Sequence, residues 1–267
     1  MMNNMTDTVK QLLIINVLFF IGSYFVPQAN ELLALHYFES DGFKFWQPIS
    51  HMFMHGSLMH IFFNMFALIS FGSALEHMWG AKKFLFFYFS CGIGAAAVHS
   101  GVNYYEIHSL LNQLENTSIT SADVHTILNT DFVSGNQYSG KLLYENAVTI
   151  FDKLKINDSD FGLLFNAAVK TQSAAVGASG AIYGLLVAFA FMFPNAELMM
   201  MFIPVPVKAK YFVPVIVLLD LFSGVTGIRL FGGGNIAHFA HVGGALIGFI
   251  MMWYWKKNQF DKNRWDR

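Results

Sequence analysis

The sequence predicts an all-α membrane protein of six transmembrane helices, with a polar helical insertion between helices three and four. Three observations lead to this prediction. Of the 267 residues, 55% are hydrophobic and only 12% are charged, about half the charged fraction of a typical soluble domain. Six long apolar runs occur, each near the roughly 20 residues that a spanning helix needs. One long polar tract interrupts them. Since unpaired backbone groups are too costly in hydrocarbon, each run is expected to be a helix.

The predicted spans are defined by their lack of charge. Five contain no Asp, Glu, Lys or Arg: Gln11–Asn30, Phe45–Leu75, Phe84–Tyr105, Thr171–Ala196 and Leu230–Trp255. The remaining span, Tyr211–Ile228, contains only Asp220, whose role the sequence leaves unexplained. We expect the first span to be a retained helix and not a signal peptide, because it lacks a strongly basic leader and is longer than an h-region.

Basic residues in the short connections predict the orientation of the chain. They follow spans two, four and six: Lys82, Lys83, Lys208, Lys210, Lys256, Lys257, Lys262, Arg264 and Arg267. The first loop, on the opposite side, has Lys44 among Glu31, Glu39 and Asp41. Since positive charge stays on the cytoplasmic side, both termini are predicted to be cytoplasmic. The predicted organisation is helices one to three in 1–102, an extracytoplasmic insertion at 103–170, helices four to six in 171–256, and a cytoplasmic tail at 257–267.

The insertion is polar and acidic, yet its apolar residues recur at helical spacing, as in Leu142, Leu143, Ala147, Ile150 and Phe151. This periodicity predicts a small helical subdomain and not a linker. The net charge of −1 gives no reason to expect a nucleic-acid partner, and the single cysteine, Cys91, excludes an internal disulfide.

The first candidate catalytic residue is Ser179, in Gly177-Ala-Ser-Gly180 at the start of the fourth predicted span. One interpretation is that Ser179 only caps that helix. The flanking glycines favour a second one, because they let a substrate backbone come close. The motif is not the nucleophile elbow of hydrolases, which needs Gly where Ala181 stands.

The second candidate is His241, near the start of the sixth span. An ionisable residue within a membrane helix is a functional candidate by default, although a structural histidine bonded to a carbonyl stays open. Gly244 and Gly248 follow His241 at intervals of three and four. This small-residue face lets another helix pack closely against the imidazole.

The third candidate is a pair, His60 and Asn64, four residues apart in the second span and therefore on one helix face. Two side-chain donors in an apolar cavity suit stabilisation of an oxyanion. His55 is expected elsewhere on this helix with a structural role. Because spans two, four and six all run inward from the outer side, the three motifs are predicted at one depth.

These motifs resemble those of rhomboid intramembrane serine proteases of the basic six-helix bacterial type. The segment Gly177–Tyr183 resembles the family's Gly-x-Ser-Gly motif with a later Tyr. The family's second-helix motif is matched by His55, His60 and Asn64, and its sixth-helix motif is matched by Ala240, His241, Gly244 and Gly248. Gly72, Glu76 and Gly80 resemble the end of its second helix, and the likeness covers residues 11–101 and 171–255.

The resemblance implies a rhomboid-like bundle in which Ser179 and His241 form a catalytic dyad. His60, Asn64 and the Ser179 amide would hold the oxyanion, Tyr183 would pack on His241, and Gly177, Gly180, Gly244 and Gly248 would support the site. Two departures from the family pattern are expected to bear on gating or substrate choice and not on the dyad. Gln47 follows Trp46 where the family usually has Arg, and the insertion is not part of the basic six-helix form.

The expected activity is therefore a serine endopeptidase that cleaves transmembrane segments near the outer face, in a bacterial cytoplasmic membrane. Its partners would be lipid and single-span protein substrates, with no metal, cofactor or nucleic acid. His241 would take the Ser179 proton and return it to the leaving amine.

The same residues admit three alternative functions. A zinc protease would use His51 and His55, but Met52 stands where that motif needs Glu. A haem electron carrier would use His60, His99 or His241. An inactive relative would bind clients without cutting them, against which the intact dyad argues.

Overall fold

The computed structural model describes residues 5–26, 28–115, 118–135, 137–200, 203–228 and 237–262. Two compact units make up the chain. The first comprises residues 1–34, 48–99 and 176–267, and the second comprises 35–47 and 100–175. The predicted tail at 257–267 and the first residues of the predicted sixth span fall partly outside the described residues, at 263–267 and 229–236.

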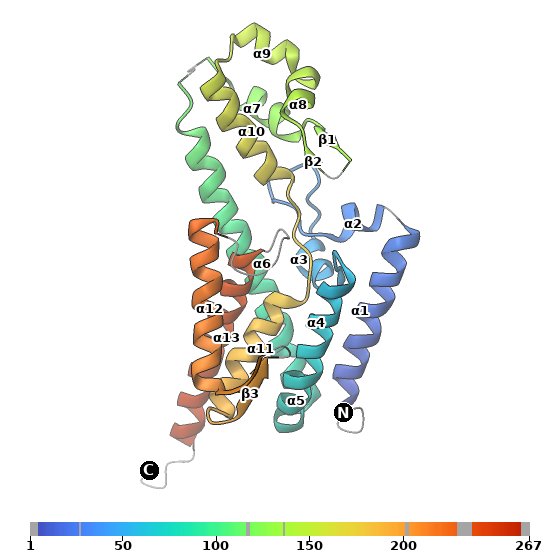
Figure 1. The fold of residues 1–267 in the computed structure, drawn as a ribbon, viewed down its shortest axis with the longest axis vertical. Coiled ribbons are helices and arrows are strands. Elements are labelled where there is room, and N and C mark those ends of the chain that lie inside the picture. The colour runs from blue at the N-terminus through green and yellow to red at the C-terminus, as the bar shows by residue number, and fades with distance from the viewer. Residues whose placement is uncertain are drawn as a thin grey trace. The chain divides into compact units, whose positions relative to one another are not determined.

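A helix lies in each of the six predicted spans (Figure 1). They are α1 (Asp7–Phe25), α4 to α5 (Leu58–Ala67 and Ser73–Trp79, joined by the π-helical turn η3, Leu68–Gly72), α6 (Ala81–Leu111), α11 (Ser179–Met192), α12 (Ala209–Thr226) and α13 (His238–Lys262). Among the described residues, four helices are long and apolar enough to cross a membrane: α1, the α4–α5 helix, α6 and α12. The apolar helix α11 is shorter, with 14 residues. The structure thus confirms a mostly helical chain with four candidate spans among the described residues, while the count of six spans stays a prediction.

Several helices do not begin or end where the predicted uncharged runs do. The second span was expected from Phe45, yet the helix begins at Leu58, where the Ser57 hydroxyl accepts the amide of His60 as an N-cap. Before it come α3 (Gln47–Ser50) and the 3₁₀ turn η2 (His51–Phe53). The fourth span was expected from Thr171, but that residue ends another helix and α11 begins at Ser179. The third uncharged run ends at Tyr105, whereas the helix α6 continues to Leu111. A lack of charge therefore does not locate the residue at which a helix begins or ends.

Glu76, at the end of the α4–α5 helix, holds the start of α1. Its carboxylate accepts the amides of Thr8 and Val9 at 3.3 and 3.1 Å and the hydroxyl of Thr6. These groups lie at the positive end of the α1 dipole, where an anion is favourable. Gly80 then ends the helix with a φ of +75°, which favours glycine.

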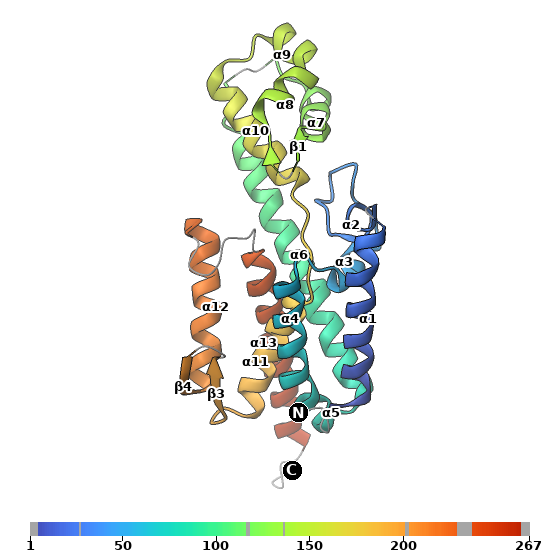
Figure 2. The ribbon, with the colours of Figure 1, turned by 45° about the vertical axis from the view of Figure 1, so that its right-hand side comes forward.

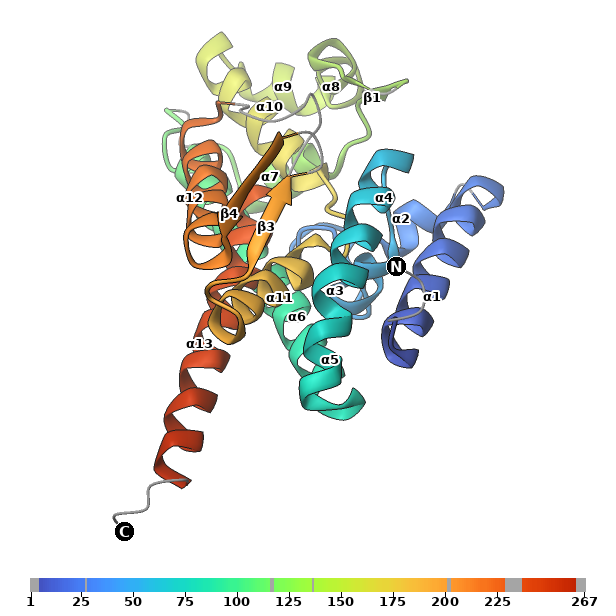
Figure 3. The same cartoon turned by 60° about the horizontal axis from the view of Figure 1, so that its bottom comes forward.

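Helices α11, α12 and α13 lie side by side (Figures 1 and 2) and carry the site described below. A hairpin of β3 (Glu197–Met200) and β4 (Ile203–Lys208) connects α11 to α12 and contacts α12 (Figure 3). It was not predicted. Pro204 and Pro206 cannot donate to a ladder, which suits an edge strand.

The second unit contains the insertion, with helices α7 (Ser121–Asn129), α8 (Gly140–Asn146), α9 (Val148–Leu154) and α10 (Asp158–Gln172) and the small strands β1 (Val133–Ser134) and β2 (Gln137–Tyr138). Polar caps start three of the helices: Thr120, Ser139 and Asn157 each accept an amide of the first turn. The unit has its own core, built from side chains of α6, α7, α8, α9 and α10.

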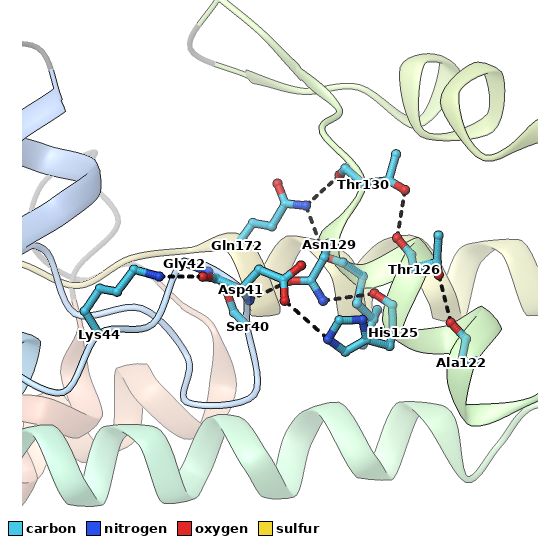
Figure 4. A network of polar contacts seen from close by, with 11 residues as sticks. Ser40, Asp41, Gly42, Lys44, Ala122, His125, Thr126, Asn129, Thr130 and Gln172 are labelled. Carbon is cyan, nitrogen blue, oxygen red and sulfur yellow. Dashed lines mark hydrogen bonds and ion pairs between the residues drawn. The ribbon is translucent and has the colours of Figure 1, made fainter.

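The first loop, residues 35–47, belongs to this same unit, and Figure 4 shows the polar contacts that bind it to the insertion. The amide of Asp41 donates to Asn129 at 3.0 Å, and the Asp41 carboxylate lies 3.5 Å from His125. Gln47, which replaces the expected Arg, is fully buried and braces the loop: it donates to the Gly42 carbonyl at 2.9 Å and accepts from the His36 amide at 3.2 Å.

Candidate active site

Ser179 and His241 come together from two helices. Ser179 is the first residue of α11, and His241 lies in the first turn of α13. The Ser179 Oγ and the His241 Nε2 are 2.8 Å apart although the residues are 62 positions apart in sequence. The N-cap position of α11 belongs to Ala178 and carries no side-chain cap bond. The hydroxyl therefore faces an imidazole, and helix capping does not describe Ser179.

Glycines let α11 and α13 approach closely enough for this contact. A Cβ on Gly244 would lie 1.8 Å from the carbonyl oxygen of Gly180, and a Cβ on Gly248 would lie 2.8 Å from the Cα of Gly184. Neither position can accept a side chain without moving the helices apart. The two glycine pairs thus set the distance between the helices that carry Ser179 and His241.

His60 and Asn64 lie four residues apart on α4 and therefore on one face of that helix, and His60 reaches the space beside Ser179. A Cβ on Gly177 would lie 2.7 Å from the Nε2 of His60 and 3.5 Å from the Oγ of Ser179. The side chains of His60 and Ser179 therefore border one small space, which Gly177, with a φ of +126°, leaves open. Asn64 is buried, and its Nδ2 has no hydrogen-bond partner among the described residues.

His55 does not lie on this helix, as had been expected, but on the irregular chain before Ser57. Its ring is buried and meets the ring of His60 edge to face at 5.1 Å. His51 is in the 3₁₀ turn η2, so His51 and His55 do not share a helix face as the zinc alternative assumed. Within the described ranges, no cluster of three or more His, Cys, Asp or Glu side chains could hold a metal ion.

Tyr183 stacks on the imidazole of His241, with ring centroids 4.3 Å apart and planes 14° apart. Its hydroxyl donates to the carboxylate of Asp220, on α12. The Nδ1 of His241 lies 3.3 Å from both carboxylate oxygens of Asp220, and the Nδ1 of His238 lies 2.5 Å from one of them. The sequence marked Asp220 only as an unexplained intramembrane acid, and it did not single out His238.

This arrangement has the parts that acyl transfer needs. A hydroxyl lies within hydrogen-bond distance of an imidazole, and the Asn64 side-chain amide, buried and with no partner in the described part of the chain, lies on the helix that also carries His60. The imidazole is fixed on its face by Tyr183 and at its far nitrogen by a carboxylate. All of these side chains belong to the first unit.

The comparisons with known proteins agree with the motifs. The family model described as "Rhomboid domain" matches residues 42–109 and 158–258, more than half of the chain. The chain is 31% identical over 113 residues to "Rhomboid protein 1, mitochondrial" of Saccharomyces cerevisiae, which covers 40% of this chain and 31% of that protein. It is 27% identical over 225 residues to an uncharacterized mitochondrial rhomboid protein of Schizosaccharomyces pombe. That alignment covers 80% of this chain and 52% of the relative.

The chain spans about a third and a half of the lengths of these two relatives. Both names place the relatives in mitochondria, so the comparisons do not support the bacterial membrane that the sequence suggested. The four long apolar helices agree with a multi-pass integral membrane protein. On the matched domain, the chain belongs to the rhomboid family.

Proposed function

We propose that this chain is a serine endopeptidase that cleaves transmembrane protein substrates within the membrane, with Ser179 as nucleophile and His241 as general base. The observation that carries the proposal is the 2.8 Å contact between the Ser179 Oγ and the His241 Nε2. Side chains so distant in sequence meet here at hydrogen-bond distance because two glycine pairs allow their helices to touch.

In the proposed reaction, the Ser179 Oγ attacks the carbonyl carbon of the scissile peptide while its proton passes to the Nε2 of His241. The tetrahedral intermediate collapses as the imidazolium gives that proton to the leaving amine. Water, deprotonated by His241, then attacks the acyl ester, and the proton returns to the Ser179 oxygen. No step requires a cofactor.

The oxyanion of the intermediate needs donors beside Ser179. Asn64 supports this role because its Nδ2 is buried and has no partner within the described residues. His60 borders the same space as the Ser179 hydroxyl, and the Ser179 amide, at the start of α11, is free of the helical hydrogen-bond ladder. These three groups form the proposed oxyanion hole.

The proposed orientation follows from the positive charges. With six spans, both termini lie on the side that carries the lysines, and the first turns of α4, α11 and α13 lie toward the opposite side. Substrates would be single-span proteins whose helices unwind near that outer face. The insertion, matched only at its edges by the family model, would lie outside the membrane on that side.

The test uses purified chain in proteoliposomes with a panel of single-span substrates. We expect cleavage by the wild-type protein, none by Ser179→Ala or His241→Ala, and normal cleavage by Ser73→Ala, which removes another buried serine hydroxyl. A fluorophosphonate should label Ser179 and no other serine. Wild-type turnover by Ser179→Ala would end the proposal, and a loss of activity with EDTA that zinc restores would favour a metalloprotease.

A further inference from the structure

The carboxylate of Asp220 lies at the centre of a polar cluster contributed by three helices. Its side chain is only 10% exposed. Tyr183 of α11 and both His238 and His241 of α13 contact it. Gly224, one turn further on α12, makes this approach possible, because a Cβ there would lie 3.1 Å from the Phe239 ring and 3.3 Å from the Cβ of His238.

A carboxylate is costly to bury unless donors surround it. One oxygen of Asp220 contacts the Nδ1 of His238 and of His241, and the other contacts the Tyr183 hydroxyl and the Nδ1 of His241. An ionised carboxylate only accepts hydrogen bonds and offers about four lone-pair sites. These contacts are satisfied when both imidazoles carry a proton on Nδ1.

That proton decides which nitrogen of His241 faces the nucleophile. A neutral imidazole has one donor and one acceptor nitrogen. With Nδ1 donating to Asp220, Nε2 is the acceptor, and it is the Nε2 that lies 2.8 Å from the Ser179 Oγ. The opposite tautomer would place a hydrogen on Nε2 and leave it unable to take the serine proton.

We propose that Asp220 is a positioning residue that fixes His241 in the tautomer required for base catalysis, with His238 and Tyr183 holding the carboxylate in place. The inference rests on the proposed function. It makes the reacting group of this chain a Ser-His-Asp triad. The carboxylate stays ionised throughout and also stabilises the imidazolium that forms during attack.

His238 is an anchor of the carboxylate and not a second base. It precedes His241 by three residues and therefore lies on the same face of α13. Its ring is nearly perpendicular to that of His241, at 83°, with centroids 6.5 Å apart. Its contact with Asp220, at 2.5 Å, is shorter than the 3.3 Å contact of His241, so His238 sets where the carboxylate lies.

A purely structural role for Asp220, as a bridge between α11, α12 and α13, makes a different prediction. Asn at this position keeps the shape and can still accept hydrogen bonds, so it would preserve such a bridge. However, its amide hydrogens would donate to the Nδ1 of His241 and favour the wrong tautomer. Asp220→Asn therefore separates positioning from bridging.

The experiment measures kcat and KM of variants in proteoliposomes, with thermal unfolding as the check on folding. Asp220→Asn should lower kcat by about 10²–10³-fold with KM unchanged, less than the roughly 10⁴-fold known for Asn at the Asp of a Ser-His-Asp triad, because the contact here is long. Asp220→Glu should recover most of the loss, since it restores the carboxylate. The matched control, Ser223→Ala, removes another buried polar group of α12 and should leave kcat unchanged.

A second measurement does not depend on any Asp220 variant. In ¹⁵N-histidine-labelled wild-type protein, the signal that disappears in His241→Ala should show a protonated Nδ1 and a bare Nε2. A protonated Nε2, or a folded Asp220→Asn protein with wild-type kcat, would overturn the inference. Ser179→Ala is measured beside them: an active Ser179→Ala protein refutes the proposed function itself, whereas an inactive one beside a fully active Asp220→Asn protein refutes only the role of Asp220.

Discussion

The contact between α11 and α13 gives a graded test of the site. Replacing Gly244 by Ala places a methyl group 1.8 Å from the Gly180 oxygen, and replacing Gly248 by Ala places one 2.8 Å from the Gly184 Cα. Since ordinary van der Waals contact begins at about 3.4 Å, the helices must separate by about 1.6 Å in the first case and about 0.6 Å in the second. Both substitutions act without touching a reacting group.

The separation converts into rate through the Ser179–His241 distance. From 2.8 Å, a shift of about 1.6 Å takes the Ser179–His241 pair well beyond the roughly 3.2 Å limit of a good hydrogen bond. A misplacement of about 1 Å costs on the order of 10² in rate. We therefore expect Gly244→Ala to lower kcat/KM by at least about 10²-fold and Gly248→Ala by about 10-fold.

The assay is cleavage of a single-span reporter in proteoliposomes, together with the rate of fluorophosphonate labelling and thermal unfolding. Gly22→Ala is the matched control, because that glycine lies in α1 and a Cβ there meets nothing within 4 Å. Overpacking also destabilises a protein by about 1–3 kcal/mol, so Gly248→Ala decides the question if Gly244→Ala does not fold. Wild-type labelling and turnover by either folded variant would refute the idea that these glycines set the catalytic distance.

Three further outcomes are expected. Asn64→Ala should lower kcat by about 10²–10³-fold with little change in KM, as for other oxyanion donors; a change in KM alone would assign Asn64 to substrate binding. Glu76→Ala should lower the free energy of unfolding by about 1–3 kcal/mol, measured in detergent, because the amides of Thr8 and Val9 lose their acceptor; unchanged stability would mean that water replaces the carboxylate. The Thr120 hydroxyl and amide hold the pKa of Asp123 below its usual range, so this carboxylate stabilises α7 above a pH of about 4 and ceases to do so as pH falls through its lowered pKa. Hydrogen-exchange protection of the first turn of α7 should fall accordingly, and Asp123→Asn should show no such pH dependence.

The helices were predictable because their signal is local. An uncharged run long enough to cross a bilayer is visible in the sequence by itself, and a helix lies in every predicted span. The start of the second helix was not predictable in this way. The segment from Phe45 to Ser57 is as uncharged as α4, although it holds only the short helix α3 and the turn η2, and α4 begins where the Ser57 hydroxyl accepts the His60 amide as an N-cap.

The contacts of the second unit could not be predicted from the sequence, because they join segments that are far apart along the chain. The bond between Asp41 and Asn129 spans 88 residues. Helical periodicity predicts that the insertion has an apolar face, but not which segment covers it. The sequence therefore predicts the first loop only as a connection between spans, although residues 35–47 belong to the same compact unit as the insertion.

The site shows where motif reasoning succeeds and where it stops. Ser179, His241 and the glycines carry recognisable spacings, because each motif must satisfy a local demand: a close helix contact, an open backbone or two donors on one face. Asp220 has no such spacing. Whether the Asp220 carboxylate meets His241 depends on how α12 is rotated against α13. Gly224 allows this close approach beside His238, and the approach exists only once the helices are packed. An acidic residue in a membrane helix indicates that a partner exists, since the burial of its charge must be compensated. Identifying that partner required the packed structure, and the partner is the imidazole that also touches the nucleophile.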